Sequence, residues 1–185
     1  MSNSISQFYD EDFINKFGEQ SSVLNEVTYN KQVPEVNVEE IAKKMGLKVS
    51  YCIMPESGNL EEKNIKVNTL DAPVRQRFTI AHELGHYLLH KPDDVVYRDV
   101  IDNYDTLFDR IREREANNFA ADLLMPEKLL SKTIDDYLKE KNWSNSLDNI
   151  QFETLLTDIA NKLNVSKISL EYRLKNLNIV QLGVK

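Results

Sequence analysis

The feature that most constrains this chain is the position of its histidines. All three, His82, His86 and His90, fall within nine residues of a sequence of 185. The first two flank Glu83 in the segment His-Glu-Leu-Gly-His, inside a proline-free run with helical spacing of its aliphatic residues. Residues four apart in an α-helix lie on one face, about 6 Å apart along the axis. Two imidazoles at this spacing can bind one zinc ion at about 2.0–2.1 Å.

Glu83 adds a carboxylate beside the predicted metal position. On a helix its side chain is turned by about 100° from that of His82, so it lies next to the metal rather than on it. There a carboxylate can take a proton from the attacking water and pass it to a leaving amine. We interpret the segment as the centre of a zinc-dependent hydrolase. The competing interpretation is an ordinary amphipathic helix with exposed histidines.

The third protein ligand of such a site must come from elsewhere in the chain. A catalytic zinc usually has three protein ligands and one open position. His90 lies two turns from His82, about 12 Å along a continuous helix, which is too far for one ion to bridge. We interpret His90 as a helix-end residue, where a cation meets the negative end of the helix dipole. The candidate source is a downstream helix with the sequence Glu-Arg-Glu-Ala-Asn-Asn-Phe-Ala-Ala at residues 113–121.

Two segments together resemble a known family. Residues 77–90 read Arg-Phe-Thr-Ile-Ala-His-Glu-Leu-Gly-His-Tyr-Leu-Leu-His, and residues 113–126 read Glu-Arg-Glu-Ala-Asn-Asn-Phe-Ala-Ala-Asp-Leu-Leu-Met-Pro. Both are similar to the ImmA/IrrE family of metallopeptidases, and the resemblance extends over residues 36–180. It implies a zincin-like core and a bacterial or phage-borne zinc endopeptidase. It also implies a protein substrate, a helix-turn-helix transcriptional repressor of a mobile element, prophage or stress regulon.

The resemblance also implies the identity of the third ligand. In the family pattern a glutamate begins the second motif and completes the metal site, and this role carries over to Glu113. Glu115 remains the alternative ligand. Asn117, one helical turn after Glu113, is a candidate to hydrogen-bond a ligand histidine and orient it. The sequence does not decide between zinc and manganese as the ion.

Other residues near the motif have open roles. Arg75 and Arg77 precede the two histidines, and they either position substrate or, as we prefer, pair with the acidic surface. Three tyrosines, Tyr87, Tyr97 and Tyr104, are candidates for the group that stabilises the transition-state oxyanion. The sequence does not choose among them.

The wider pattern predicts an α+β fold, mostly helical with a small sheet. Strands are expected at residues 47–53 and 65–68, with turn formers at Pro55 and residues 57–59 between them. A helix over 73–90 has Pro73 in its first turn and Asp71 as a candidate cap, and should stop before Pro92. Gly46 is expected to end the helix predicted at residues 36–45. The other helices are expected at residues 36–45, 108–125, 127–139, 152–163 and 167–177.

The domain organisation follows from these elements. Residues 1–35 are expected to form an N-terminal arm that packs on the core or stays loose, with a short helix around 10–17. Residues 36–185 form the expected metallopeptidase domain, including a helix-turn-helix-like segment at about 150–180. In the last helix the expected core residues are Ile168, Leu170, Leu174 and Leu177.

Composition bears on the binding partners and the cellular location that we expect for this protein. The net charge of −7 argues against a general nucleic-acid binder. Cys52 is the only cysteine, the N-terminus is acidic without an apolar segment, and no membrane-spanning apolar run is present, so we expect a cytoplasmic protein.

Two other functions are alternatives to the interpretation of the chain as a peptidase. Residues 161–185 carry five basic residues against one acidic residue, which permits a DNA-binding regulator. We prefer to interpret this segment as a substrate-docking or packing element. The second alternative is a metal-binding antirepressor module without proteolysis, in which Glu83 is merely structural.

Overall fold

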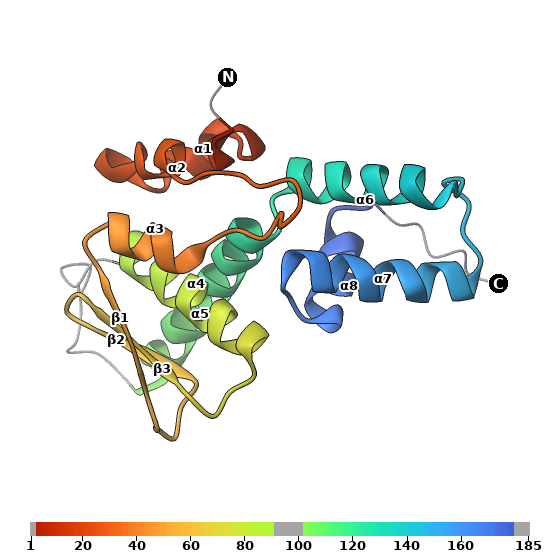
Figure 1. The fold of residues 1–185 in the computed structure, drawn as a ribbon. Helices are drawn as coiled ribbons and strands as arrows, with labels where there is room; N and C mark the ends of the chain where they lie inside the picture. Colours follow the sequence, from red (N-terminus) through yellow and green to blue (C-terminus); the bar gives the residue numbers. More distant parts are fainter. Residues whose placement is uncertain (1–2, 91–101, 180–185) are drawn as a thin grey trace.

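The computed structural model describes residues 3–90 and 102–179, which form the α+β fold that the sequence predicts. Figure 1 shows the sheet on one side of the α4–α5 helix pair and helices α6 to α8 on the other. Within the described residues, no helix combines the length and apolar character needed to traverse a bilayer. The elements in chain order are η1 (Ile5–Phe8), α1 (Glu11–Asn15), η2 (Gly18–Gln20), α2 (Val23–Glu26), α3 (Val38–Lys44), β1 (Lys48–Cys52), β2 (Gly58–Glu61), β3 (Asn64–Asn68), α4 (Pro73–Leu89), α5 (Asp102–Leu124), α6 (Glu127–Lys141), α7 (Asn149–Leu163) and α8 (Lys167–Asn176).

The three-stranded sheet supports one side of α4. Its strand order is β1–β3–β2, with β1 parallel and β2 antiparallel to the central strand β3. The side chains of Ile65 and Val67 in β3 are fully buried, and α4 contacts both β2 and β3. The predicted strands correspond to β1 and β3.

The sequence prediction of a turn at residues 57–59 is wrong, because residues 58 and 59 belong to the edge strand β2. The bend covers residues 55–57, and Gly58 begins the strand. A Cβ atom at Gly58 would clash with the Thr79 side chain of α4 and would lie 2.6 Å from the Lys66 carbonyl oxygen. The glycine therefore marks a close approach between sheet and helix rather than a turn.

Helix α4, which carries the histidines, begins with Pro73 in its first turn, as predicted, and ends with His90 as its C-cap residue. The prediction of Asp71 as the cap is wrong. Ala72 occupies the N-cap position without a side-chain cap hydrogen bond. Proline in the first turn has no N–H, so one donor fewer needs a cap there. Pro92, the expected stop signal, lies outside the described residues.

The N-terminal arm packs onto α5 and is not loose. The predicted short helix is α1, and the Phe13 ring in it stacks on the Phe119 ring of α5 with their centroids 5.1 Å apart. The Phe17 ring lies 5.8 Å from the same ring, and the Tyr9 hydroxyl donates a hydrogen bond to the Leu123 carbonyl oxygen at 2.7 Å. Aromatic residues four apart at positions 9, 13 and 17 are the sequence signal that indicates this apolar face.

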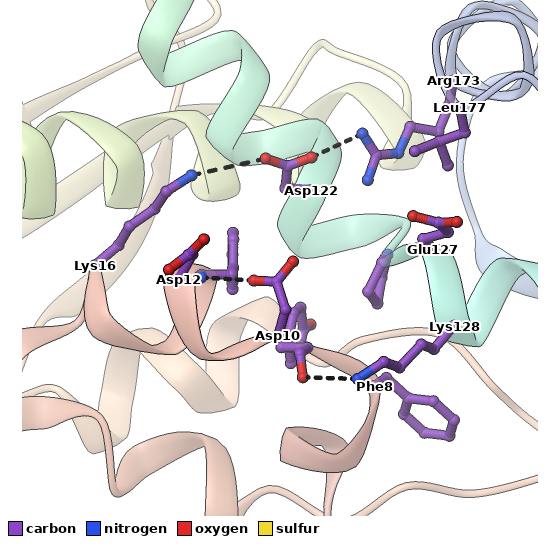
Figure 2. A pocket seen from close by; sticks show the side chains of 12 residues that line it. Phe8, Asp10, Asp12, Lys16, Asp122, Glu127, Lys128, Arg173 and Leu177 are labelled. Carbon is purple, nitrogen blue, oxygen red and sulfur yellow. Dashed lines mark hydrogen bonds and ion pairs between the residues drawn. The ribbon is translucent and has the colours of Figure 1, made fainter.

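Near its C-terminal end, α5 is also held by ion pairs. The Asp122 carboxylate lies 2.7 Å from Arg173 Nη1 of α8 and 3.8 Å from Lys16 Nζ of the N-terminal arm (Figure 2). Arg173 Nε donates a further hydrogen bond to the Met125 carbonyl oxygen at 3.0 Å. A cavity of about 260 Å³ opens beside these groups, between the N-terminal arm, the start of α6 and α8. Asp122 thus connects α5 to two distant segments of the chain.

Helices α7 and α8, joined at residues 164–166, occupy the segment for which the sequence predicts a helix-turn-helix-like arrangement. Leu170 and Leu174 are buried as expected, and Leu177 is partly buried. The prediction of Ile168 as a core residue is wrong, because 68% of its surface is exposed. Ile168 precedes Leu170 by two positions, which places the two side chains on nearly opposite faces of the helix.

Candidate metal centre

Helix α4 brings the two motif histidines together on one face. Their Nε2 atoms lie 3.0 Å apart, and the ring centroids are separated by 4.6 Å. The Asn117 Oδ1 atom of α5 lies 3.1 Å from His82 Nδ1. An amide oxygen accepts a hydrogen bond from a protonated Nδ1, and this tautomer leaves the lone pair of Nε2 free toward His86.

Glu113 reaches the same point from α5. Its Oε2 atom lies 3.4 Å from His82 Nε2, and its Oε1 atom lies 3.2 Å from His86 Nε2. Ligand atoms held at about 2.0–2.1 Å by one tetrahedral ion lie about 3.3–3.4 Å from each other. The observed separations of 3.0, 3.2 and 3.4 Å therefore fit a divalent ion, with two nitrogens and one carboxylate oxygen as donors.

The close contact between α4 and α5 makes this meeting possible. A Cβ atom at Gly85 would lie 3.1 Å from Ala116 Cα and 3.2 Å from the Ala116 carbonyl oxygen. The absence of a side chain at Gly85 therefore lets the two backbones approach. The sequence interpretation assigned no role to this residue, although a glycine inside a helical pattern signals a packing requirement.

Glu115, the alternative ligand, lies elsewhere. Its Oε2 atom is 3.8 Å from His90 Nε2, and the same nitrogen lies 3.2 Å from the Arg112 carbonyl oxygen. Among the described residues, only His82, His86 and Glu113 form a cluster suited to hold a metal ion. His90 and Glu115 instead contact each other at the end of α4.

Glu83 is buried beside the cluster. Burial, and secondarily the negative charge of Glu113, raise the pKa of the Glu83 carboxyl to about 7. Burial also lowers the pKa of His82, and burial together with the charge of His82 lowers that of His86. Both imidazoles are therefore favoured in the neutral form, which is the form that binds metal ions.

The two arginines before the motif differ in their surroundings. Arg77 is partly buried, lies 3.6 Å from the Glu35 carboxylate, and donates hydrogen bonds to the Val36 and Asn164 carbonyl oxygens at 3.0 and 3.1 Å. Arg75 is exposed, and its Nε donates to Ser57 Oγ at 3.2 Å. Arg77 thus has a structural role, whereas Arg75 is available to a ligand.

The tyrosine candidates for oxyanion stabilisation remain candidates. Tyr87 is partly buried and packs against the core next to His86. Tyr97 lies outside the described residues, as does the side chain of Tyr104.

The chain has an α+β fold with a candidate metal centre between α4 and α5. Comparison with known proteins identifies its family. Residues 34–175 match the family model of the IrrE N-terminal-like domain. The chain belongs to the ImmA/IrrE family of metallopeptidases.

Named relatives match over shorter segments. The chain is 36% identical over 78 residues to the radiation response metalloprotease IrrE of Deinococcus radiodurans, covering 42% of this chain and 24% of that protein. It is 42% identical over 79 residues to IrrE of Deinococcus deserti, covering 42% and 26%. It is 39% identical over 59 residues to the metallopeptidase ImmA of Bacillus subtilis, covering 32% and 33%. The aligned segments thus span about a quarter to a third of these relatives.

Proposed function

We propose that this protein is a zinc-dependent endopeptidase that acts on a protein substrate. The single observation that carries the proposal is the meeting of His82, His86 and Glu113 at 3.0–3.4 Å, with the buried Glu83 next in sequence to His82. The relatives named as metallopeptidases support the same reaction class. Two imidazoles and one carboxylate are typical ligands of catalytic zinc, and manganese is the alternative ion.

In this proposal each residue has a distinct task. His82, His86 and Glu113 hold the ion, which supplies Lewis acidity for peptide-bond hydrolysis. Glu83 takes a proton from the attacking water while the water oxygen bonds to the carbonyl carbon. The same carboxyl then gives the proton to the amide nitrogen as the carbon–nitrogen bond breaks. Asn117 fixes the orientation of the His82 ring through its Nδ1 atom.

The proposed substrate is a helix-turn-helix transcriptional repressor of a mobile element, prophage or stress regulon, and the proposed setting is the bacterial cytoplasm. Both follow from the family resemblance and, for the setting, from the single cysteine. Specificity would then come from docking of a folded partner in addition to the peptide segment that is cut.

DNA binding is not favoured by the charges of the C-terminal helices. The four basic side chains described beyond residue 160 each lie within ion-pair distance of a carboxylate. They are Lys162, Lys167, Arg173 and Lys175. Basic groups that already pair within the protein offer less charge to DNA phosphates.

Replacement of Glu83 by glutamine tests the proposal. Glu83→Gln keeps the size of the side chain and all three proposed ligands, so the protein should retain one equivalent of zinc. Loss of the general base should lower the cleavage rate by about 10²–10⁴-fold. Zinc content is measured by atomic spectrometry, and cleavage by mass spectrometry of candidate repressors co-expressed with each variant.

The same experiment separates proteolysis from an antirepressor function without cleavage. If Glu83→Gln relieves repression as well as the wild-type protein and leaves the repressor intact, proteolysis is not the mechanism. Intact repressor with the wild-type protein, together with full zinc loading, would lead to the same conclusion.

A further inference from the structure

A small apolar cavity lies near the candidate metal centre, between segments that are distant in sequence. Its volume is about 130 Å³, and it is formed by the first half of α4, the end of α5 and the start of α8. Among the described residues, Arg75 is the one charged member of its lining. The apolar part of the lining is Val74, Phe78, Leu124, Met125 and Val165, and Ser169 of α8 also contributes.

Phe78 connects this cavity to the metal centre. It precedes His82 by one turn of α4, and the centroids of the two rings lie 6.3 Å apart. An extended peptide advances about 3.3 Å per residue. A peptide whose scissile bond lies at the two motif histidines therefore places a side chain roughly one to three residues away over the cavity.

The size and the lining of the cavity fit a single apolar side chain. An apolar cavity of about 150 Å³ in a protein accepts a benzene molecule. A slightly smaller cavity, of about 130 Å³, can therefore hold an aliphatic side chain the size of leucine.

Arg75 adds a positive charge at this cavity. Its Cζ atom lies 6.0 Å from the Phe78 ring centroid. Among the side chains that the structure describes (residues 3–90 and 107–179), no carboxylate is paired with Arg75, although Arg77 two positions later pairs with Glu35. A guanidinium in this position can bind a substrate carboxylate through charge-assisted hydrogen bonds.

We propose that this cavity is a substrate side-chain subsite that takes one apolar residue, while Arg75 binds a carboxylate next to it. The inference rests on the proposed peptidase function and adds the substrate class, a peptide in which an apolar residue neighbours an acidic one. It also gives the C-terminal helices a part in substrate selection, because Val165 and Ser169 form one wall.

Peptide binding tests the subsite without relying on activity. The full chain carrying Glu83→Gln is titrated with the capped peptides Ac-Leu-Glu-NH₂, Ac-Glu-Leu-NH₂, Ac-Leu-Gln-NH₂ and Ac-Ser-Glu-NH₂. The NMR signals of the Val74, Leu124 and Met125 methyl groups report on the cavity. We expect one of the two Leu/Glu peptides to shift these signals and to bind about fivefold more tightly than Ac-Leu-Gln-NH₂. Ac-Leu-OH separates a terminal carboxylate from a side-chain carboxylate.

Two matched variants assign the effect to the cavity. Arg75→Gln, at an exposed position, should remove the preference for the Glu peptide. Ser169→Leu, which fills the cavity, should abolish the methyl shifts. The subsite is overturned if the methyl signals do not respond to the Leu peptides, or if Arg75→Gln keeps the preference for Glu.

Cleavage of a mixture of proteome-derived peptides by the zinc-loaded wild-type protein separates the subsite from the peptidase proposal. Cleavage with a side-chain profile that neither Arg75→Gln nor Ser169→Leu changes would overturn the subsite and leave the peptidase proposal standing. If the capped peptides bind while neither the mixture nor the candidate repressors are cut, the peptidase proposal fails and the binding site remains.

Discussion

The two sides of the contact between α4 and α5 differ in chemistry. On the inner side, Gly85 of α4 lies against Ala116 and Phe119 of α5, which are 0% and 1% exposed. On the outer side, the proposed ligands form a polar group that reaches the surface, and the Glu113 side chain is 58% exposed. Packing on the inner side therefore fixes the distance between α4 and α5. The proposed ligands on the outer side come from both helices, so their separation depends on that distance.

This difference implies that the fold and the metal site respond separately to substitution. Apolar burial contributes about 25 cal/mol per Å², so the inner side provides most of the stability of the helix pair. Exposed polar groups contribute little to folding. Changes on the outer side should alter metal binding at nearly constant stability, and changes on the inner side should alter both.

The largest expected effect is the loss of metal binding in Glu113→Gln. A structural zinc site with four ligands provides about 10–16 kcal/mol, so one ligand is worth about 2.5–4 kcal/mol, or about 10²–10³-fold in affinity. Competition with a chromophoric chelator measures the affinity. The matched control is Glu115→Gln on the same helix, which should bind zinc like the wild type. Equal affinities of the two variants would rule out Glu113 as the ligand.

A smaller effect, on both properties, is expected at Gly85. The Gly85→Val side chain must displace the backbone of Ala116, which should lower the free energy of unfolding by about 2–3 kcal/mol. Because α5 then moves away from α4, zinc affinity should fall as well. Urea denaturation of the metal-free protein and the chelator assay measure the two effects. Wild-type stability in this variant would show that the close contact does not determine the spacing.

Asn117→Ala should weaken metal binding less than loss of a ligand does. Removal of a group that orients a ligand histidine typically lowers affinity by about 10–100-fold, or about 1.4–2.7 kcal/mol. Asn118→Ala is the matched control, because this neighbouring side chain is exposed and outside the cluster. The metal-free stability of both variants should be unchanged. No difference in zinc affinity between them would remove Asn117 from the site.

The smallest effect is expected for the ion pair between Lys16 of the N-terminal arm and Asp122, near the C-terminal end of α5. Lys16→Ala removes an ion pair of 3.8 Å between partly exposed side chains, so the free energy of unfolding should fall by at most about 0.5 kcal/mol. Zinc affinity should not change, because Asp122 keeps its shorter contact with Arg173. Thermal unfolding and the chelator assay measure both, and a loss of affinity would mean that the N-terminal arm acts on the site.

Much of the fold could be predicted from local periodicity. The spacing of apolar residues identified α4, β1 and β3, and the left-handed φ of +77° at Gly46 follows its predicted place after α3. The predictions failed where tertiary contacts decide. The sequence predicts Gly58 in a turn, whereas the structure places it in a strand beneath Thr79. The sequence predicts Ile168 in the core, whereas Leu170 is buried and Ile168 is exposed on the other side of α8.

The site was predictable in part. The pairing of His82 with His86 is a property of one helix, so spacing alone places the two rings together. Periodicity places Glu113 and Glu115 on nearly opposite faces of α5, but which of these faces meets the two histidines depends on how α5 packs on α4. The cavity near Arg75 was beyond sequence reasoning, because its walls come from residues 74–78, 124–125 and 165–169, which no local pattern relates.

The contacts of the partly buried Arg77 limit how far the chain can be shortened. Its guanidinium joins the carbonyl groups of Val36 and Asn164, near the two ends of the family match. A fragment that stopped before residue 164 would keep all proposed ligands and Glu83, but would deprive the partly buried guanidinium of an acceptor, at about 1–3 kcal/mol. The stretch of chain required for folding is therefore longer than the stretch that carries the chemistry.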